Sequence, residues 1–209
     1  GRLVEPMAFV PAAERYNLMP ASDRWVLREV IRFSAAAQRT TGPRPLFAVN
    51  LSARSLGDEH LHDYLRDLLV NHGVPGDTLC IEITEAAAAA NLTQSSQRIA
   101  EFKRLGCRMS LDHFGSGVSS LTDLKAFPVD FIKIDGGFIR SLADDQVNRA
   151  VAESINRVAH VMTIETVAEC TETNAVVTIL KEMGIDHAQG YVLALPQPIE
   201  ELSAVVPLA

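Results

Sequence analysis

Residues 109–117 read MSLDHFGSG, a short apolar run that ends on the polar pair Asp112 and His113 and continues into a glycine-containing loop. A short apolar run bounded by turn residues is typical of a strand that is buried on both faces of a parallel sheet. Asp112 and His113 would then stand at the carboxyl end of that strand. In α/β proteins that edge carries the functional site.

Five further apolar runs end in the same way. They cover residues 46–49, 79–81, 131–132, 166–168 and 185–188, and they are followed by Asn50, Glu82, Lys133, Glu169 and Gln189. Segments with helical spacing of apolar residues alternate with the runs. Because crossovers between parallel strands are right-handed, this alternation predicts an α/β fold, a parallel sheet wound with helices. It also places the six polar positions on one rim.

Capping residues predict where several helices begin and end. Ser22 and Asp23 are candidate N-caps of an early helix, and Asn91 is a candidate N-cap of a later one. Gly73 and Gly106 predict helix ends. A closed eight-stranded barrel needs two more strands than these six, and we expect them upstream of Gly1; an open sheet is the alternative. No linker divides residues 1–209, so we expect one domain that is incomplete at its N-terminus.

Composition limits the classes of partner. The chain has 209 residues, of which 47% are hydrophobic and 22% charged, and a formal net charge of −7. An acidic chain is a poor non-specific ligand for DNA or RNA, so neither is predicted. The three cysteines are widely spaced and predict reduced thiols in a cytoplasmic protein. No apolar run approaches the roughly 20 residues of a membrane span, so no membrane contact is predicted for this domain.

The rim residues suit a metal centre. Asn50, Glu82, Asp112 and Glu169 offer the hard oxygen ligands that Mg²⁺, Mn²⁺ and Ca²⁺ prefer. Three carboxylates held close together repel one another, and a cation relieves that repulsion. Taken singly, a carboxylate at a strand end is more often a helix cap or a surface group. Recurrence at intervals of 20 to 36 residues along the chain favours a shared site.

The residues around these positions resemble the motifs of EAL domains, bacterial phosphodiesterases of cyclic di-GMP, in the same order and over nearly the whole chain. The motifs are Asn50-Leu51-Ser52, Glu82-Ile83-Thr84-Glu85, Leu111-Asp112-His113-Phe114-Gly115-Ser116-Gly117, Lys133-Ile134-Asp135, Ala168-Glu169-Cys170-Thr171-Glu172-Thr173 and Gln189-Gly190-Tyr191. The resemblance implies a TIM-like (β/α)₈ barrel of EAL type with an antiparallel first strand, here missing its first two strands.

The resemblance also implies roles for individual residues. It implies two divalent ions, Mg²⁺ or Mn²⁺, with metal ligands at Asn50, Glu82, Asp112, His113 and Glu169. It implies catalytic or supporting roles for Lys133, Glu169, Glu172 and Gln189, and stabilisation of a loop by Glu85, Gly115, Ser116 and Gly117. The partners that it implies are cyclic di-GMP, a second copy of the chain in a homodimer, and fused sensor or cyclase domains.

Two departures from the family pattern leave alternatives open. The Glu-Ala-Leu strand, with its metal-ligand Glu and nearby Arg, is absent from the sequence. His113 stands where the family has a second Asp, either as a nitrogen ligand that Mn²⁺ or Zn²⁺ tolerates or as a rim histidine that binds nothing. Cys170 and Thr171 replace the usual Gly-Val. The function implied is a metal-dependent phosphodiesterase that hydrolyses cyclic di-GMP to linear pGpG, with impaired activity; the alternatives are an inactive receptor for the dinucleotide and an interaction module.

Overall fold

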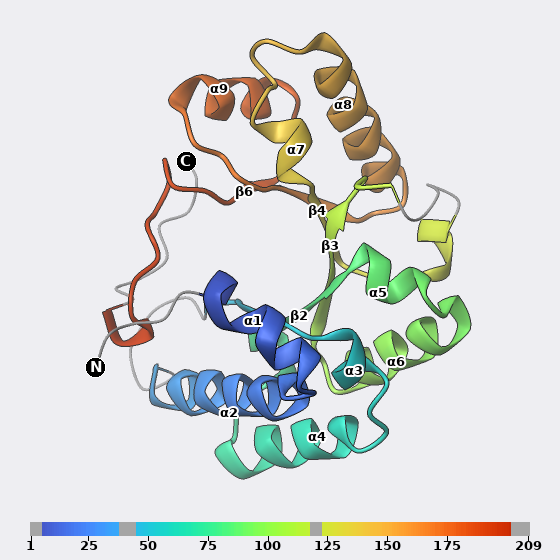
Figure 1. Cartoon of the computed structure of the whole chain (residues 1–209), viewed down its shortest axis with the longest axis vertical. Coiled ribbons are helices and arrows are strands. Elements are labelled where there is room, and N and C mark those ends of the chain that lie inside the picture. The colour runs from blue at the N-terminus through green and yellow to red at the C-terminus, as the bar shows by residue number, and fades with distance from the viewer. Residues whose placement is uncertain (1–5, 38–44, 118–122, 202–209) are drawn as a thin grey trace.

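The computed structural model describes residues 6–37, 45–117 and 123–201, which contain one sheet of six parallel strands. The strands follow the sequence order, β1 (Phe47–Asn50), β2 (Leu79–Thr84), β3 (Arg108–Phe114), β4 (Phe131–Ile134), β5 (Glu165–Ala168) and β6 (His187–Ala188). They curl into an open arc with helices along its outer side (Figure 1). The predicted α/β class is therefore confirmed, as a half-barrel. The two further strands, expected upstream of Gly1, stay a prediction.

Helices connect the strands and cover the sheet. They are α1 (Pro6–Arg15), α2 (Met19–Ala37), α3 (Ala53–Leu56), α4 (Leu61–His72), α5 (Glu85–Ala89), α6 (Leu92–Arg104), α7 (Gly136–Ile139), α8 (Gln146–Val161) and α9 (Asn174–Glu182), with 3₁₀ turns η1 (Gly76–Thr78), η2 (Asp123–Ala126) and η3 (Ile199–Glu201). Among the helices of these described ranges, none is long and apolar enough to cross a bilayer.

The capping predictions have mixed outcomes. Oδ1 of Asn91 accepts a hydrogen bond from the backbone N–H of Gln94 at 3.2 Å and so caps α6, and Gly73 ends α4 with a φ of 62°. The predicted start at Ser22 or Asp23 is wrong, because α2 begins at Met19. The Asp23 carboxylate is buried and accepts hydrogen bonds from the N–H and hydroxyl of Ser52, at 3.1 and 2.6 Å. The Asp23 side chain therefore bonds to Ser52 after β1 and does not cap the helix.

Apolar residues on both faces of the strands form one core. Ile81, Ile83, Leu111 and Ile132 are buried in neighbouring strands, and the inner faces of the helices pack around them. Each such side chain contributes about 1.5–3 kcal/mol on burial. The core fixes the register of the sheet, which in turn decides where the polar side chains of the strands meet.

A polar network ties α8 to the amino ends of β5 and β6. Oδ2 of Asp186 accepts a hydrogen bond from the N–H of Thr166 and lies next to Nε2 of His160, both at 2.8 Å. The Thr166 hydroxyl donates to Oδ1 of Asn156 at 2.6 Å, and the Asn156 amide donates to the carbonyls of Met183 and Gly184. Burial alone would raise the pKa of Asp186, but the hydrogen bonds from Thr166 and His160 outweigh it and lower that pKa.

We predict that Asp186→Asn lowers the free energy of unfolding by about 1–2 kcal/mol at pH 7, because a charged acceptor of two short contacts is lost. A carboxylate whose pKa is lowered by folding stabilises the protein above its ordinary value of 3.8, and that contribution disappears as the pH falls through the folded value. The difference in free energy of unfolding between wild type and Asp186→Asn should therefore vanish below about pH 4. Urea denaturation at pH 3 and pH 7 measures this difference.

Asp144→Asn is the matched control, since Asp144 is exposed between α7 and α8. Asp144→Asn should change the free energy of unfolding by no more than about 0.5 kcal/mol at pH 3 and at pH 7. A deficit for Asp186→Asn that is equally large at pH 3 and pH 7 would contradict the proposed role of the charge.

Candidate metal centre at the carboxyl ends of the strands

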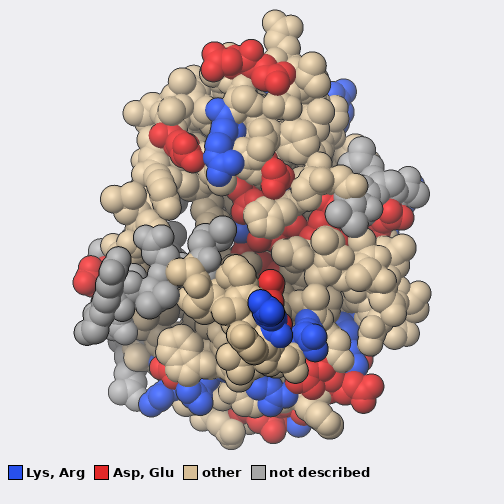
Figure 2. Space-filling view, in the orientation of Figure 1, with Lys and Arg blue, Asp and Glu red and all other residues tan. Residues whose placement is uncertain are grey.

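Lys133 on β4 lies among three carboxylates from three other segments. Its Nζ atom is 3.0 Å from Oε2 of Glu82 on β2, 3.0 Å from Oδ1 of Asp112 on β3, and 3.1 Å from Oε1 of Glu169 directly after β5. All four side chains are buried. Acidic side chains gather near the middle of the face seen in Figure 2, between the α7–α9 side and the α1–α4 side. We call Glu82, Asp112, Lys133 and Glu169 the charged cluster.

Strand pairing explains how residues far apart in sequence reach the charged cluster. Glu82 and Asp112 lie within β2 and β3, and Lys133 lies within β4, so these strands continue beyond the apolar runs from which they were predicted. Asn50 is in register with Glu82 on the neighbouring strand, and it is exposed. The sheet thus places four of the six predicted rim positions in one buried group, with Asn50 beside it.

The electrostatics of the charged cluster follow from its burial. Burial raises the pKa of Glu82 and of Glu169, and the Lys133 ammonium only partly opposes that rise. Burial would lower the pKa of Lys133, but Glu82, Asp112 and Glu169 outweigh it and hold that pKa above its ordinary value. Lys133 is therefore a permanent cation at neutral pH. One ammonium faces three carboxylates, which leaves the cluster with excess negative charge.

His113 lies at the edge of the charged cluster, half exposed. Its Nδ1 atom is 3.2 Å from Oδ2 of Asp135 and 3.3 Å from Oε2 of Glu169, and its Nε2 atom is 3.8 Å from Oδ2 of Asp112. Its φ of 55° is left-handed, a conformation in which His is enriched among non-glycine residues. This backbone turn directs the side chain of a strand residue towards the carboxylates.

Asp112, His113 and Glu169 form a donor set that suits a metal ion. Each offers one ligand atom, and these atoms lie within 4.8 Å of one another. Oε2 of Glu169 is buried and accepts no hydrogen bond from the described residues. A buried carboxylate oxygen that accepts no hydrogen bond carries a desolvation cost of about 1–3 kcal/mol or more, which a cation would remove. The residues therefore fit a divalent ion.

The predicted loop residues make a separate set of contacts. Glu85 at the start of α5 is buried, and its Oε2 atom accepts a hydrogen bond from the N–H of Gly115 at 2.8 Å. Gly115 has a φ of 94°, and a Cβ atom there would lie 2.9 Å from the ring of Phe138. The N–H of Ser116 donates to the carbonyl of His113 at 3.3 Å. Gly117, with a φ of 112°, ends this described stretch. The loop is thus held at its first residues, next to His113.

Two predicted site residues lie outside the charged cluster. Glu172 is exposed, and its Oε1 atom is 3.3 Å from Nε of Arg140. Gln189 is exposed, and its backbone joins the segment after β6 to Ala168 and Thr171.

Sequence reasoning assigned no role to two residues near the site, Asp135 and Arg140. Asp135 follows β4 directly, which is the same signal that singled out the other strand-end residues. Arg140 follows α7 and contacts both Glu172 and Sγ of Cys170.

Cys170 occupies a backbone position that favours glycine. Its φ is 52°, and for a residue other than Gly, Asn or Asp this conformation costs about 1–2 kcal/mol. Its side chain packs against Gly136 at the start of α7, where an added Cβ would lie 2.5 Å from Sγ. The cysteine and the glycine therefore fit as a pair, and neither position can gain bulk alone.

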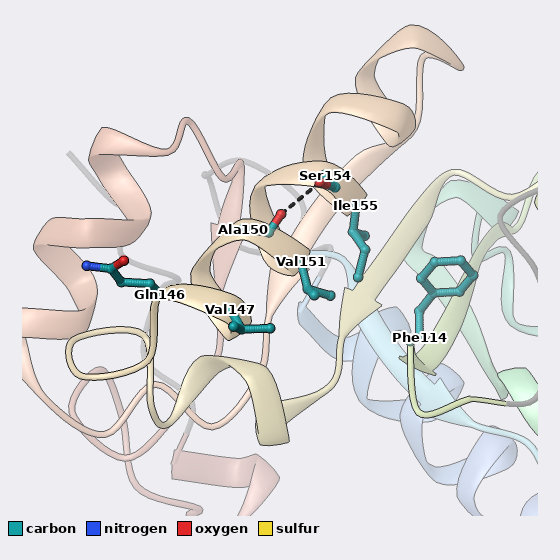
Figure 3. Close-up of a pocket in the computed structure, with 8 residues that line it drawn as sticks. Phe114, Gln146, Val147, Ala150, Val151, Ser154 and Ile155 are labelled. Atoms are coloured by element: carbon teal, nitrogen blue, oxygen red, sulfur yellow. Dashed lines mark hydrogen bonds between the residues drawn. The ribbon is translucent and has the colours of Figure 1, made fainter.

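An apolar hollow of about 560 Å³ is lined by Phe114, Gly115 and α8. Val147, Val151 and Ile155 project from α8 towards the side of Phe114, while Gln146 points away (Figure 3). The Ser154 hydroxyl is turned back to the carbonyl of Ala150 at 2.7 Å. Phe114 and Gly115, which line this hollow, directly follow His113 along the chain.

Comparisons with known proteins point to one family. A family model described as "EAL domain" matches residues 1–196. The cyclic di-GMP phosphodiesterase PdeB of Shewanella oneidensis is 37% identical over 95% of this chain, and the cyclic di-GMP phosphodiesterase PdeF of Escherichia coli is 31% identical over 99% of it. The chain spans 23% and 28% of the lengths of these two relatives.

Solved structures show the same fold. The PaMucR phosphodiesterase in a c-di-GMP complex has a TM-score of 0.90 and 33% identity, over 95% of this chain and 80% of that one. The EAL domain of Xanthomonas citri FimX, also in complex with c-di-GMP, has a TM-score of 0.90 and 28% identity, over 97% of this chain and 80% of that one.

We predict that Lys133→Met lowers the free energy of unfolding by about 3–5 kcal/mol at pH 7, since it leaves buried carboxylates without their shared cation. A carboxyl group whose pKa is raised by folding favours the folded state below that pKa and opposes it above. The deficit should therefore narrow as the pH falls and the carboxyl groups of Glu82 and Glu169 become neutral. Chemical denaturation in the presence of EDTA measures it, with the exposed Lys125→Met on η2 as the control. If Lys133→Met and Lys125→Met lost equal free energy of unfolding, the Lys133 ammonium would not be the main partner of the three carboxylates.

We predict that Gly136→Ala lowers the free energy of unfolding by about 1–3 kcal/mol, because the new methyl group meets Sγ of Cys170. In a Cys170→Gly background the same change should cost much less, since the obstruction is gone. A double-mutant cycle measured by thermal unfolding gives the coupling. Gly57→Ala is the control, because a Cβ there meets only backbone oxygens at 3.6 and 3.9 Å. Additive effects of the Gly136 and Cys170 changes would contradict the packing argument.

Proposed function

The chain belongs to the EAL domain family, and we propose that in the native protein it hydrolyses cyclic di-GMP to linear pGpG with divalent ions, Mg²⁺ or Mn²⁺. The observation that supports this most directly is the charged cluster, in which three buried carboxylates share one ammonium and Oε2 of Glu169 accepts no hydrogen bond from the described residues. The relatives named as cyclic di-GMP phosphodiesterases support the choice of substrate.

The proposed ligands of the ions are Asn50, Glu82, Asp112, His113 and Glu169. Bound divalent ions would supply positive charge that stabilises the phosphoryl oxygens as negative charge develops there. Lys133 holds the oxygens of Glu82, Asp112 and Glu169 together and adds a fixed positive charge. The same carboxylates hold the pKa of Lys133 above its ordinary value. Glu172 and Gln189 are proposed to support the bound nucleotide from the exposed rim.

The proposed reaction is the hydrolysis of one phosphodiester bond. A water oxygen bonds to phosphorus, the bond from phosphorus to one sugar oxygen breaks, and the released sugar oxygen takes up a proton. The ring of the dinucleotide opens, and the product keeps one phosphate as a monoester. Glu85 holds Gly115 next to His113, so the loop at Gly115, Ser116 and Gly117 is proposed to keep the metal side of the site in position.

The proposed setting is a longer signalling protein in the cytoplasm. Both curated relatives are much longer than the part that this chain matches, which supports fused sensor or cyclase domains. We also propose a homodimer. The buried thiols of Cys80 and Cys107 are unpaired, which agrees with a reducing compartment.

A second candidate is a receptor that binds cyclic di-GMP without hydrolysing it. His113 favours this candidate, because an imidazole in place of a carboxylate removes one negative charge from the ligand set and weakens a site for Mg²⁺. An interaction module without nucleotide binding is the remaining alternative.

We predict metal-dependent turnover of cyclic di-GMP by the native protein. Glu169→Gln should reduce turnover by at least about 100-fold, since even outer groups of a metal site contribute 10- to 100-fold. The measurement pairs a turnover assay in Mg²⁺ or Mn²⁺ with calorimetric titration of the dinucleotide. Glu153→Gln is the control, because Glu153 is paired with Arg149 on the surface of α8.

The outcomes separate the three functions. Turnover that Glu169→Gln abolishes supports the phosphodiesterase. Tight binding without turnover in either metal overturns it in favour of the receptor. The absence of both turnover and binding leaves the interaction module as the answer.

A further inference from the structure

The two ring nitrogens of His113 have different surroundings. Nδ1 is hydrogen-bonded to Oδ2 of Asp135 at 3.2 Å and also lies 3.3 Å from Oε2 of Glu169. Asp135 is itself fixed, because its Oδ1 atom accepts a hydrogen bond from the N–H of Gly137 at 2.8 Å and its own N–H donates to the carbonyl of Phe114 at 3.2 Å. A carboxylate accepts only, so Asp135 keeps the proton on Nδ1. Nε2 is then left with a free lone pair.

In each of the two carboxylates near this nitrogen, Asp112 and Glu169, one oxygen contacts Lys133 and the other does not. Oδ1 of Asp112 is engaged by Lys133 at 3.0 Å and by the backbone N–H of His113 at 3.1 Å. Its other oxygen, Oδ2, is the atom that lies 3.8 Å from Nε2 of His113. Oε1 of Glu169 is engaged by Lys133, and its buried Oε2 lies 3.3 Å from Nδ1 of His113 without accepting a hydrogen bond from the described residues. Oδ2 of Asp112, Oε2 of Glu169 and Nε2 of His113 are therefore the atoms that neither Lys133 nor Asp135 contacts.

We infer that Asp112, Glu169 and Nε2 of His113 form an ion position that selects transition metals such as Zn²⁺ and Co²⁺ over Mg²⁺, and that Asp135 is the positioning residue that makes Nε2 the ligand. The inference rests on the proposed function, which requires a metal centre. It goes further by naming the kind of ion that one position of that centre takes. Imidazole suits Zn²⁺, Co²⁺ and Ni²⁺, whereas Mg²⁺ takes oxygen ligands almost exclusively.

The pairing of His113 with Asp135 has the form found at established histidine–metal sites. A ligating histidine donates its other N–H to a carboxylate or carbonyl, which fixes the tautomer and the ring orientation. Here the Asp135 carboxylate is held by the N–H of Gly137 in the first turn of α7, so its position is fixed by the fold. A histidine that served only as a counter-ion for Glu169 would need no such support and would bind no metal.

The test measures metal binding without nucleotide, in the full chain freed of metal with EDTA. ZnCl₂ and MgCl₂ are titrated by competition with a chelating dye, and ¹⁵N-histidine labelling reports the imidazole nitrogens, with His113 assigned from His113→Asn. We expect the Nε2 resonance of His113 to shift with Zn²⁺ while Nδ1 keeps its proton. In His113→Asp the ratio of Zn²⁺ to Mg²⁺ affinity should fall at least about tenfold.

Asp135→Asn tests the positioning role. Asn keeps an oxygen for the N–H of Gly137 but presents an amide donor to Nδ1, which moves the ring proton to Nε2 and removes the ligand lone pair. Zn²⁺ affinity should fall about 10- to 100-fold while Mg²⁺ affinity changes little. His187→Asn is the matched control, because His187 pairs with the single exposed carboxylate of Glu165. Circular dichroism confirms that each variant is folded.

The inference fails if Zn²⁺ leaves both His113 nitrogens unshifted, or if wild type and His113→Asp have the same Zn²⁺-to-Mg²⁺ ratio. Turnover of cyclic di-GMP together with that result would leave the proposed function standing and this inference overturned. Selective Zn²⁺ binding through Nε2 without turnover would support the inference and overturn the enzyme.

Discussion

The structure depends on one ammonium group shared by three carboxylates in a space that water scarcely reaches. Each contact between Nζ of Lys133 and its partners is close to 3 Å, and all four side chains come from different strands or strand ends. A slip of one residue in any strand would turn its side chain to the other face of the sheet and leave a buried charge unpaired. The charged cluster therefore penalises wrong registers, while the apolar core supplies the free energy that keeps it buried.

The same arrangement is a poor solution for stability alone. Replacing a buried ionic group by apolar side chains of similar volume is often neutral or stabilising, so the cluster does not exist to hold the sheet together. Burial raises the pKa of Glu82 and of Glu169, and the one ammonium of Lys133 opposes that rise only in part. What remains is an oxygen-rich cluster with excess negative charge, in which Oε2 of Glu169 accepts no hydrogen bond from the described residues. Such a cluster makes physical sense as a place for cations.

The sequence was sufficient to predict the sheet and most of the cluster, because buried parallel strands appear as short apolar runs and the functional edge is common to all of them. It was not sufficient for contacts set by tertiary geometry. Asp23 matches a helix cap in composition, yet it bonds to Ser52 across the fold. Asp135 follows a strand as plainly as Glu169 does, but only the coordinates bring it to His113. Lys133 was expected on the rim, whereas its place at the centre of the carboxylates follows from how the arc curls.

Backbone conformation explains why two departures from the family pattern differ in kind. His113 and Cys170 both have left-handed φ values, 55° and 52°. Asp and His are both enriched in this region, so an exchange between them changes the ligand chemistry and leaves the backbone nearly unstrained. A cysteine in place of glycine strains the backbone and gains packing against Gly136 instead. The first departure acts on the ion, and the second acts on the support of the loop that follows Glu169. His113 therefore bears on which ion the site takes, whereas Cys170 bears on how the segment after Glu169 packs.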